Sequence, residues 1–371
     1  MKVGILTVPF NNNYGGFLQA YALKTVIQNM GHEVLFINRK RNKPQDVKSI
    51  LKRILIKLGI ITDKYEDRVK LLSVNTNMFL EKYLTPITEP YFSHKALRKC
   101  TKLGVECFVV GSDQVWRYKY AADSIDDFFF SFIDDNSIKR FSYAASFGTD
   151  IMDYPKNKLK ECQQLLKFFS GLSVREASGV DVLKALDITQ ESCNVVLDPT
   201  MLLSPKHYLD NLISVDSIPD FPYLLSYILD DNECINSIIK TIAQQTGLRV
   251  VTVKAQTGHI DDLLPLISVE QWISMIYYAK FVITDSFHGT VFSILFNKQF
   301  LVYGNSDRGL SRFESLLSSF SLTNRFVDST DSLKALNIED DIKWNKVNER
   351  IELLRCKSLA YLKTQLNNNK D

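Results

Sequence analysis

The stretch KFVITDSFHGTVFSILFN, residues 280–297, decides the fold class of this chain. Residues 280–285 have the short apolar run of a β-strand, and residues 291–296 continue as an apolar helix. Residues 285–290, most of them polar, therefore lie where a strand ends and a helix begins, which is where α/β proteins hold ligands. His288 stands in the middle of this turn.

Short apolar runs alternate with segments of helical period over almost the whole chain, which predicts parallel sheets with helices on their faces. The predicted strands lie near 3–7, 34–37, 107–110, 141–144, 172–174, 194–197, 223–229, 249–253, 281–284 and 300–303, and helices of the second half near 231–246, 268–279 and 288–296. We expect an α/β fold with two Rossmann-like domains that face each other across a cleft.

The 371 residues suit two domains of ordinary size. We predict a first domain over 1–205, a linker over 206–222 and a second domain over 223–371, because the stretch 205–222 has three prolines and no strong period. The last long segment, about 341–366, has loosely helical spacing. This terminal helix packs either on its own domain or across onto the other one.

Composition excludes several classes of protein. The net charge of +3 is too small to indicate a nucleic-acid-binding protein. No run of 18 apolar residues exists, and residues 1–7 have the pattern of a first strand and not of a signal peptide, so we expect a cytoplasmic protein. Six cysteines without C-x-x-C spacing predict free thiols and argue against a zinc site or a disulfide framework.

A basic amphipathic helix is predicted over 46–58. Eight Lys or Arg and one acid occur between Arg39 and Lys57, and apolar residues recur at helical spacing from Val47 to Leu58. Such a helix can lie on an anionic membrane surface. The alternative is an ordinary surface helix that packs on the protein through the same apolar stripe.

Two segments at predicted strand ends offer groups for hydroxyls or phosphate. Paired glycines after the first strand allow backbone N–H groups to approach an anion or a sugar, although a tight turn requires them equally. Ser112 and Asp113 after the third strand can hydrogen-bond hydroxyls, or they can cap the next helix. The residues of this group are Asn13, Tyr14, Gly15, Gly16, Gln19, Ser112, Asp113 and Gln114.

Three further segments end in residues suited to an anion. Residues 143–148 end a strand in small residues, as a wall against a ligand or a tight bend would. Arg175 offers a bidentate fork to a carboxylate or phosphate, with a structural salt bridge to Glu176 as the alternative. His288 at a helix start is a candidate acid–base, with Gly289 and Thr290 N–H groups directed at an incoming anion.

Three negative findings restrict the chemistry. The sequence has no His, Asp or Glu cluster with metal-ligand spacing, no G-x-S-x-G motif and no cysteine beside a histidine. We therefore expect no metal and no cofactor. An acid–base, anion-binding cations and glycine-lined turns must carry the reaction.

Six segments, taken in order, resemble the polysaccharide pyruvyltransferase family over roughly residues 1–305. They are N-N-x-Y-G-G-x-x-L-Q-A-Y-A-L, V-G-S-D-Q-V-W, Y-A-A-S-F-G, S-V-R-E, L-D-P-T and T-D-S-F-H-G-T. The resemblance implies a fold similar to the GT-B glycosyltransferase architecture. It also implies an enzyme that moves pyruvate from phosphoenolpyruvate onto a sugar as a cyclic ketal and releases phosphate.

The resemblance implies roles for individual residues. Arg175 and His288 match residues that line the phosphoenolpyruvate pocket in the family, and Ser286, Phe287, Gly289, Thr290 and Glu176 are their neighbours in the motifs. The group from Asn13 to Gln114 then faces the acceptor. The implied acceptor is a galactose-type sugar on a lipid-linked oligosaccharide for a capsule or exopolysaccharide, which gives the basic helix a purpose at the cytoplasmic face of the inner membrane.

The chain departs from the R-L-H-G pattern of many members, because Ser286 and Phe287 stand where Arg and Leu would be. One expected cation is therefore missing, and Arg140, Arg308 and Arg312 are candidates to replace it. Two other functions fit the same fold: a glycosyltransferase that uses a nucleotide sugar, for which Glu270 is a weak candidate ligand, and a sugar- or phosphate-binding protein without turnover.

Overall fold

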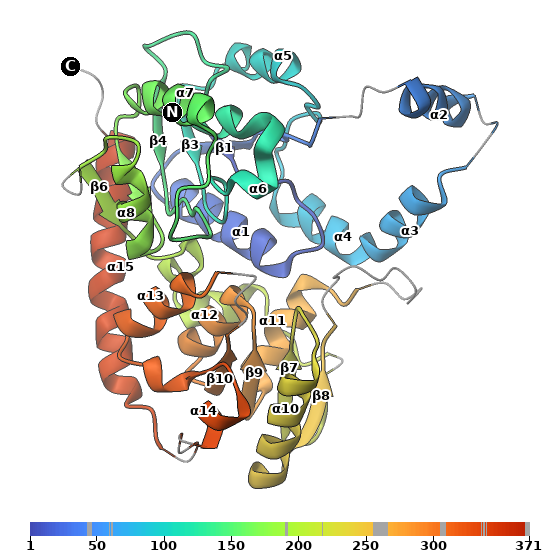
Figure 1. The fold of residues 1–371 in the computed structure, drawn as a ribbon, viewed down its shortest axis with the longest axis vertical. Helices are drawn as coiled ribbons and strands as arrows, with labels where there is room; N and C mark the ends of the chain where they lie inside the picture. The colour runs from blue at the N-terminus through green and yellow to red at the C-terminus, as the bar shows by residue number, and fades with distance from the viewer. Residues whose placement is uncertain are drawn as a thin grey trace.

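The computed structural model (Figure 1) describes residues 1–42, 47–58, 60, 62–189, 192–216, 218–254, 266–304, 309–334, 336, 338 and 340–367. Strands and helices alternate along these residues, as the hydrophobic pattern predicts. Arg308, one of the three candidate cations, and Asp46 of the basic segment lie outside the described residues.

The first half of the chain builds a parallel sheet in the order β2-β1-β3-β4. A further parallel pair, β5 and β6, joins its β4 edge through bridges between residues 141 and 171 and between residues 145 and 174. These strands are β1 (Lys2–Leu6), β2 (Glu33–Phe36), β3 (Cys107–Val110), β4 (Lys139–Ser142), β5 (Leu172–Val174) and β6 (Cys193–Val195). Most of their residues are buried, as expected for strands covered on both faces.

The second half builds a five-stranded parallel sheet in the order β11-β10-β9-β7-β8. Its strands are β7 (Tyr223–Tyr227), β8 (Arg249–Thr252), β9 (Phe281–Thr284), β10 (Gln299–Tyr303) and β11 (Phe326–Val327). Each half thus has the parallel sheet and flanking helices of a Rossmann-like domain.

Helices follow the strands in both halves. Those of the first half include α1 (Tyr14–Asn29), α2 (Val47–Lys57), α3 (Lys64–Leu72), α4 (Val74–Tyr83), α5 (His94–Leu97), α6 (Tyr118–Ala121), α7 (Lys156–Leu166), α8 (Ala177–Lys184), α9 (Pro205–Asn211) and the 3₁₀ helices η1 (Arg98–Lys102), η2 (Ala122–Phe129) and η4 (Pro199–Leu202). Those of the second half are α10 (Glu233–Thr246), α11 (Val269–Tyr278), α12 (Phe287–Leu295), α13 (Ser311–Ser319), α14 (Thr330–Lys334) and α15 (Trp344–Asn367). The segment expected as a linker, 206–222, thus begins with most of α9.

One hydrophobic core runs through both halves. Tyr14 of α1 stacks on Trp272 of α11 with 5.4 Å between ring centroids, and Tyr208 of α9 meets Phe292 of α12 edge-on at 5.2 Å. Aromatic pairs of this kind stabilise by about 0.5–1.5 kcal/mol beyond their area. The halves are therefore in direct apolar contact beside the edges where strands end.

The terminal helix α15 crosses from the second half to the first, one of the two packings that the sequence allows (Figure 1). Tyr361 Oη donates to the Ser142 carbonyl at 2.9 Å, and Ser358 Oγ accepts from the Leu197 N–H at 3.0 Å. Arg355 Nε donates to the Met201 carbonyl at 2.7 Å. These bonds anchor the end of the chain beside η4, which leads into the candidate site.

The basic helix α2 lies away from the body of the protein (Figure 1). Leu51, Ile54 and Leu58 on its apolar stripe are 54%, 49% and 67% exposed. The protein therefore covers these three side chains only in part. Lys52 pairs with Asp63 at 2.9 Å.

The structure can be compared with two predictions from composition, one on the cysteines and one on membrane-spanning helices. All six cysteines are free thiols, and four of them are buried. Among the described helices, none combines the length and the apolar character needed to cross a bilayer.

Candidate active site

The helix α12 begins at a serine cap at the carboxyl end of β9. Ser286 Oγ accepts the Gly289 N–H at 3.3 Å, and the Ser286 carbonyl accepts the Thr290 N–H at 3.0 Å. Thr290 Oγ1 donates to the same carbonyl at 3.0 Å. This corrects the expectation that the amides of Gly289 and Thr290 await an anion, since both already have partners in the helix cap.

His288 is held in a narrow space between the two halves. Its side chain is almost fully buried, and its Nε2 lies 3.4 Å from Asp198 Oδ2. A Cβ atom on Gly15 would lie 2.1 Å from His288 Nδ1, so only glycine fits at that position of α1. The first glycine of the pair therefore serves the close approach of α1 to the histidine. Gly16 has more room, since its nearest neighbour would be 3.4 Å away.

Arg175 follows β5 and is surrounded by three carboxylates. Its Nη1 lies 3.0 Å from Asp198 Oδ2, its Nη2 3.6 Å from Asp113 Oδ1 and its Nε 3.6 Å from Glu176 Oε2. Burial favours the neutral guanidine, but the carboxylates outweigh it and raise the pKa of Arg175 above its ordinary value. The arginine is thus firmly charged in a buried centre.

Asp198 joins Arg175 to His288, and the sequence analysis assigned it no role. Burial acts to raise its pKa, yet the charges and hydrogen bonds of His288 and Arg175 outweigh burial and hold this pKa well below the ordinary value. Asp198 Oδ1 also accepts from the Thr200 N–H at 3.0 Å and caps η4. The signal that could have identified Asp198 was its place in L-D-P-T, directly after a predicted strand, as for the other candidates.

Glu176 and Ser112 bring two further segments to this centre. Ser146 Oγ of the Y-A-A-S-F-G segment donates to Glu176 Oε1 at 2.5 Å. Ser112 Oγ lies 3.4 Å from Asp198 Oδ2. All five segments selected at predicted strand ends therefore meet around Arg175, together with the L-D-P-T segment.

Two arginines lie close to the ring of Phe287. The guanidinium carbon of Arg175 is 4.0 Å from its ring centroid, and that of Arg312 from α13 is 5.8 Å away. Burial and the nearby charge of Arg175 lower the pKa of Arg312 to about 10. Arg312 therefore remains charged at neutral pH and lies beside the position of the missing cation.

Arg140 is excluded from the same role by its contacts. Its guanidinium donates to the carbonyl oxygens of Ile133 at 3.3 Å and Asp135 at 3.2 Å, and it stacks on Phe168. It is an internal structural arginine at β4. Of the two candidate cations that the structure describes, Arg312 alone lies at the centre.

Two cavities adjoin this centre and differ in size. A small one of about 70 Å³ is lined by Arg175, Asp198, Phe287 and Arg312 among others. A wider one of about 260 Å³ contains Asn13, Asp113 and Gln114 in its wall. Since small-molecule pockets typically measure roughly 300–1,000 Å³, the first is smaller than a usual ligand pocket and the second approaches a usual size.

The remaining predicted acceptor residues have structural partners. Tyr14 is buried against Trp272 and donates to the Ile267 carbonyl at 3.2 Å. Gln19 is fully buried; its amide donates to Thr7 Oγ1 at 3.1 Å and its Oε1 accepts the Ser112 N–H at 3.1 Å. Neither residue lines the wider cavity, so both support the walls from behind.

A larger hollow of about 690 Å³ lies between α4 and α11, with Glu270 in its wall. None of the residues that surround Arg175 lines it. Glu270 therefore lines a different cavity from the one beside Arg175 and Phe287.

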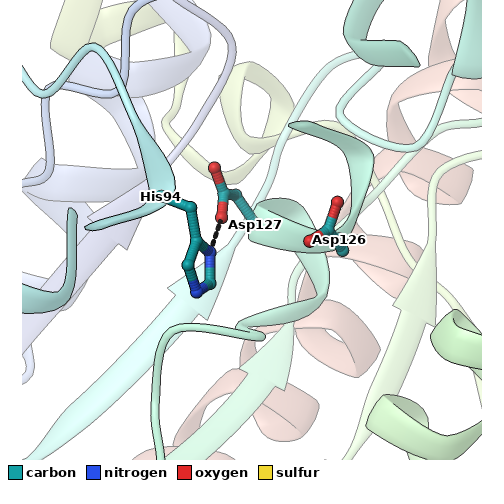
Figure 2. A group of neighbouring side chains, drawn as sticks. All are labelled: His94, Asp126 and Asp127. Atoms are coloured by element: carbon teal, nitrogen blue, oxygen red, sulfur yellow. Dashed lines mark hydrogen bonds and ion pairs between the residues drawn. The ribbon is translucent and has the colours of Figure 1, made fainter. Parts of the chain in front are cut away.

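Figure 2 shows a group with the composition of a metal site, formed by His94, Asp126 and Asp127. Asp127 is already paired: Arg39 Nε lies 2.7 Å from one of its oxygens and His94 Nδ1 2.7 Å from the other. Asp126 lies 3.4 Å from Lys158 Nζ. These ion pairs account for the group, which touches none of the residues around Arg175.

Solved structures with similar folds include a putative epimerase, a protein of S. aureus and a plant protein. A putative UDP-N-acetylglucosamine 2-epimerase from Listeria monocytogenes matches with a TM-score of 0.53 and 10% identity, over 100% of this chain and 98% of that one. MnaA of S. aureus, solved with UDP, matches with a TM-score of 0.52 and 10% identity, over 100% of this chain and 98% of that one. UGT89C1 of Arabidopsis thaliana, complexed with UDP, matches with a TM-score of 0.51 and 12% identity, over 99% of this chain and 100% of that one. At such identities the likeness concerns the fold alone, and it confirms the GT-B type arrangement of two Rossmann-like domains.

The sequence comparisons agree with the motifs that meet at Arg175. No curated protein matches the chain significantly. The sequence model of polysaccharide pyruvyl transferases matches residues 13–307, which include every segment of the charged centre up to α12. The chain therefore belongs to the polysaccharide pyruvyl transferase family.

Proposed function

We propose that this protein transfers pyruvate from phosphoenolpyruvate to two hydroxyls of one sugar, with release of phosphate. The observation that carries the proposal is the buried constellation in which Asp198 links Arg175 to His288. It combines an acid–base group with a fixed guanidinium, and these are the two functions that the reaction requires.

The donor binds beside Phe287, where two cations are available. Three carboxylates already surround Arg175, so a second positive charge is needed for an anionic donor, and Arg312 supplies it. Arg175 offers its planar fork to the carboxylate or phosphate of the donor. The small cavity of about 70 Å³ then widens by movement between the halves to admit the donor, as in other enzymes that close around their ligands.

His288 acts first as an acid and then as a base. Its proton goes to the methylene carbon of phosphoenolpyruvate, which leaves an oxocarbenium-like centre at the neighbouring carbon. One sugar hydroxyl forms a C–O bond to that centre and gives its proton to His288. The bond to phosphate then breaks, and the second hydroxyl closes the ketal ring while its proton leaves with phosphate or water. General acid–base catalysis contributes about 10²–10⁴-fold to such rates.

Asp198 orients His288 during this sequence. A carboxylate against an imidazole fixes the orientation of the ring, as in other acid–base sites. Gly15 allows α1 to approach the other side of the ring. Together they hold the histidine in one orientation while the proton moves.

The acceptor lies in the wider cavity against Asn13, Asp113 and Gln114. We expect a galactose-type sugar on a lipid-linked precursor of a surface polysaccharide. This part of the proposal rests on family membership and on the hydrogen-bonding groups in the cavity wall.

The helix α2 brings the enzyme to the cytoplasmic face of the membrane that carries this acceptor. The exposed side chains of Leu51, Ile54 and Leu58 provide the apolar contact. Lys48 and Lys52 are exposed on the same helix and match the negative charge of anionic lipids. Each Lys or Arg near such a surface contributes about 1 kcal/mol.

Vesicle co-sedimentation tests the membrane contact. A variant with Lys48, Lys52, Arg53 and Lys57 changed to Gln should lose binding to vesicles that contain phosphatidylglycerol, while wild type binds these and ignores phosphatidylcholine vesicles. Removal of Lys95, Lys99 and Lys102, cations outside α2, is the matched control. Equal binding by wild type and the α2 variant would remove this part of the proposal.

A nucleotide-sugar glycosyltransferase is the second candidate function, because two of the similar folds were solved with UDP. The third is a binding protein without turnover. Thermal stabilisation separates the donors: we expect phosphoenolpyruvate to raise the melting temperature of wild type and not of Arg175→Ala. Stabilisation by UDP-sugars alone would favour the glycosyltransferase, and stabilisation by phosphoenolpyruvate without turnover on any acceptor would favour the binding protein.

A further inference from the structure

The wider cavity occupies the topological switch point of the first sheet. In the order β2-β1-β3, the chain leaves β1 toward β2 on one side and later enters β3 on the other side. The cavity of about 260 Å³ is lined by Val8, Pro9, Asn11 and Asn13, which follow β1, and by residues 113–115, which follow β3. Ligands of open α/β sheets bind in this crevice.

The segment that follows β2 adds positive charge to this cavity. Arg39, Lys40 and Arg41 all line it. Arg39 already forms an ion pair with Asp127, with 2.7 Å between Nε and Oδ2. Lys40 and Arg41 form no ion pair with a carboxylate of the described residues. Two cations therefore face a crevice that already offers amides for hydroxyls.

The side chain of Lys40 is only partly exposed to solvent, which favours a role in binding an anion. Its side chain is partly buried, and its Nζ has the Phe10 carbonyl at 3.5 Å. Burial lowers the pKa of Lys40, because the charged form loses water. A bound anion would restore the lost stabilisation of the charge.

Asp113 connects this cavity to the charged centre. Its side chain belongs to the cavity wall and lies 3.6 Å from Arg175 Nη2. A sugar that fills the crevice would therefore present hydroxyls toward Arg175 while its other end lies near Lys40 and Arg41.

We propose that this crevice binds a sugar that carries a phosphate group, with Lys40 and Arg41 on the phosphate and Asn13, Asp113 and Gln114 on the hydroxyls. The role of this sugar as acceptor rests on the proposed function, whereas its binding does not. The phosphate belongs either to a free glycosyl phosphate or to the diphosphate of a lipid-linked sugar, which share this chemistry.

Calorimetric titration of the full chain tests the proposal with galactose 1-phosphate, galactose and phosphoenolpyruvate as probes. Lys40→Gln and Arg41→Gln should each lower the affinity for galactose 1-phosphate by about tenfold or more, since each removes a charge-assisted hydrogen bond to the phosphate. The affinity of both variants for phosphoenolpyruvate should stay within about twofold of wild type, because the proposal places the donor and the sugar phosphate at two separate anion sites. Lys99→Gln is the matched control, because Lys99 is an exposed cation outside the cavity.

Three results would overturn the proposal. Unchanged affinity for galactose 1-phosphate in the Lys40→Gln, Arg41→Gln double variant is the first. The second is a loss of that affinity in Arg312→Ala alone, which would place the phosphate at the donor site. The third is equal affinity for galactose and galactose 1-phosphate in wild type. If Lys40→Gln fails to fold, the exposed Arg41 carries the test alone.

Two further arms separate this inference from the proposed function and identify the source of the phosphate. Binding of galactose 1-phosphate that depends on Arg41, with no binding of phosphoenolpyruvate, would support the crevice and contradict the pyruvyl transfer. A galactosyl diphosphate with a short prenyl chain, if it binds at least tenfold more tightly than galactose 1-phosphate, identifies the lipid-linked source. The reverse order identifies the free sugar phosphate, and both orders require Lys40 and Arg41.

Discussion

The buried centre around Arg175 and the open crevice beside Lys40 hold positive charge in opposite ways. In the centre, Arg175 has three carboxylates within 3.6 Å. In the crevice, Lys40 and Arg41 line a cavity of about 260 Å³ without a carboxylate partner among the described residues. A buried charge is stable only when an opposite charge compensates it, whereas water can solvate a partly exposed charge until a ligand binds.

This difference predicts where mutations act. Loss of a compensated buried charge strands its partners and lowers stability as well as activity. Loss of a crevice charge leaves no partner stranded, so it lowers affinity alone. The variants below probe this contrast in order of their expected effect on stability.

Arg175→Ala should have the largest effect. It leaves Asp113, Glu176 and Asp198 without their shared cation, and removal of one partner from a buried pair typically costs about 3–5 kcal/mol. Urea denaturation measures the loss, and we expect no detectable transfer. Arg175→Lys should recover part of the stability and little activity, because it restores the charge and not the fork. If Arg175→Ala has the same free energy of unfolding as wild type, the proposed difference between the buried centre and the crevice would be contradicted.

The pH dependence of stability should report Asp198. Folding lowers its pKa, so the contribution is complete above the unfolded value of about 4 and is lost as pH falls through the lower folded value. Wild type and Asp198→Asn should differ by a few kcal/mol at pH 7, and the difference should shrink below pH 4. Urea midpoints from pH 7 to pH 3 measure it. A difference that stays constant over this range would show that Asp198 is not ionised in the centre.

Gly15→Ala and Gly16→Ala form a matched pair with an intermediate effect. The new methyl at position 15 would meet His288 Nδ1 at 2.1 Å, whereas at position 16 the nearest atom is 3.4 Å away. Overpacking should cost about 1–3 kcal/mol at Gly15. At Gly16 the change should be small or favourable, since alanine suits a helix better. Equal melting temperatures for the two variants would contradict the close packing of His288 against α1.

Arg41→Gln should have the smallest effect on stability. Exposed substitutions usually change the free energy of unfolding by less than about 0.5 kcal/mol. Thermal unfolding should therefore match wild type while affinity for galactose 1-phosphate falls. A clear loss of stability would mean that Arg41 has a structural partner, and the crevice would then resemble the centre.

Much of the fold and part of the site follow from sequence because parallel strands place their carboxyl ends on one edge. Five segments chosen at strand ends converge, and His288 and Arg175 lie where that rule expects them. The rule cannot show which groups inside a segment are already used. The Gly289 amide is taken by Ser286 Oγ, and Gln19 is fixed by Thr7 and Ser112, contacts that depend on the packing of the whole chain.

Asp198, Arg312 and Lys40 illustrate what sequence spacing misses. Asp198 lies in a segment whose order was informative but whose chemistry was not assigned. Arg312 reaches Phe287 from α13, 25 positions later in the sequence, and only the tertiary packing brings the two together. Lys40 belongs to a basic run that sequence analysis treated as part of a helix segment, while the structure places it in the crevice after β2.

The most direct test is phosphate release from phosphoenolpyruvate in the presence of galactose-, mannose- and glucose-ended lipid-linked acceptors. Wild type should release phosphate only when a suitable acceptor is present, and His288→Ala should lower the rate by about 10²–10⁴-fold without loss of fold. Arg175→Ala should abolish it. Release that persists at the wild-type rate in His288→Ala, or that needs no acceptor, would contradict pyruvyl transfer by this centre.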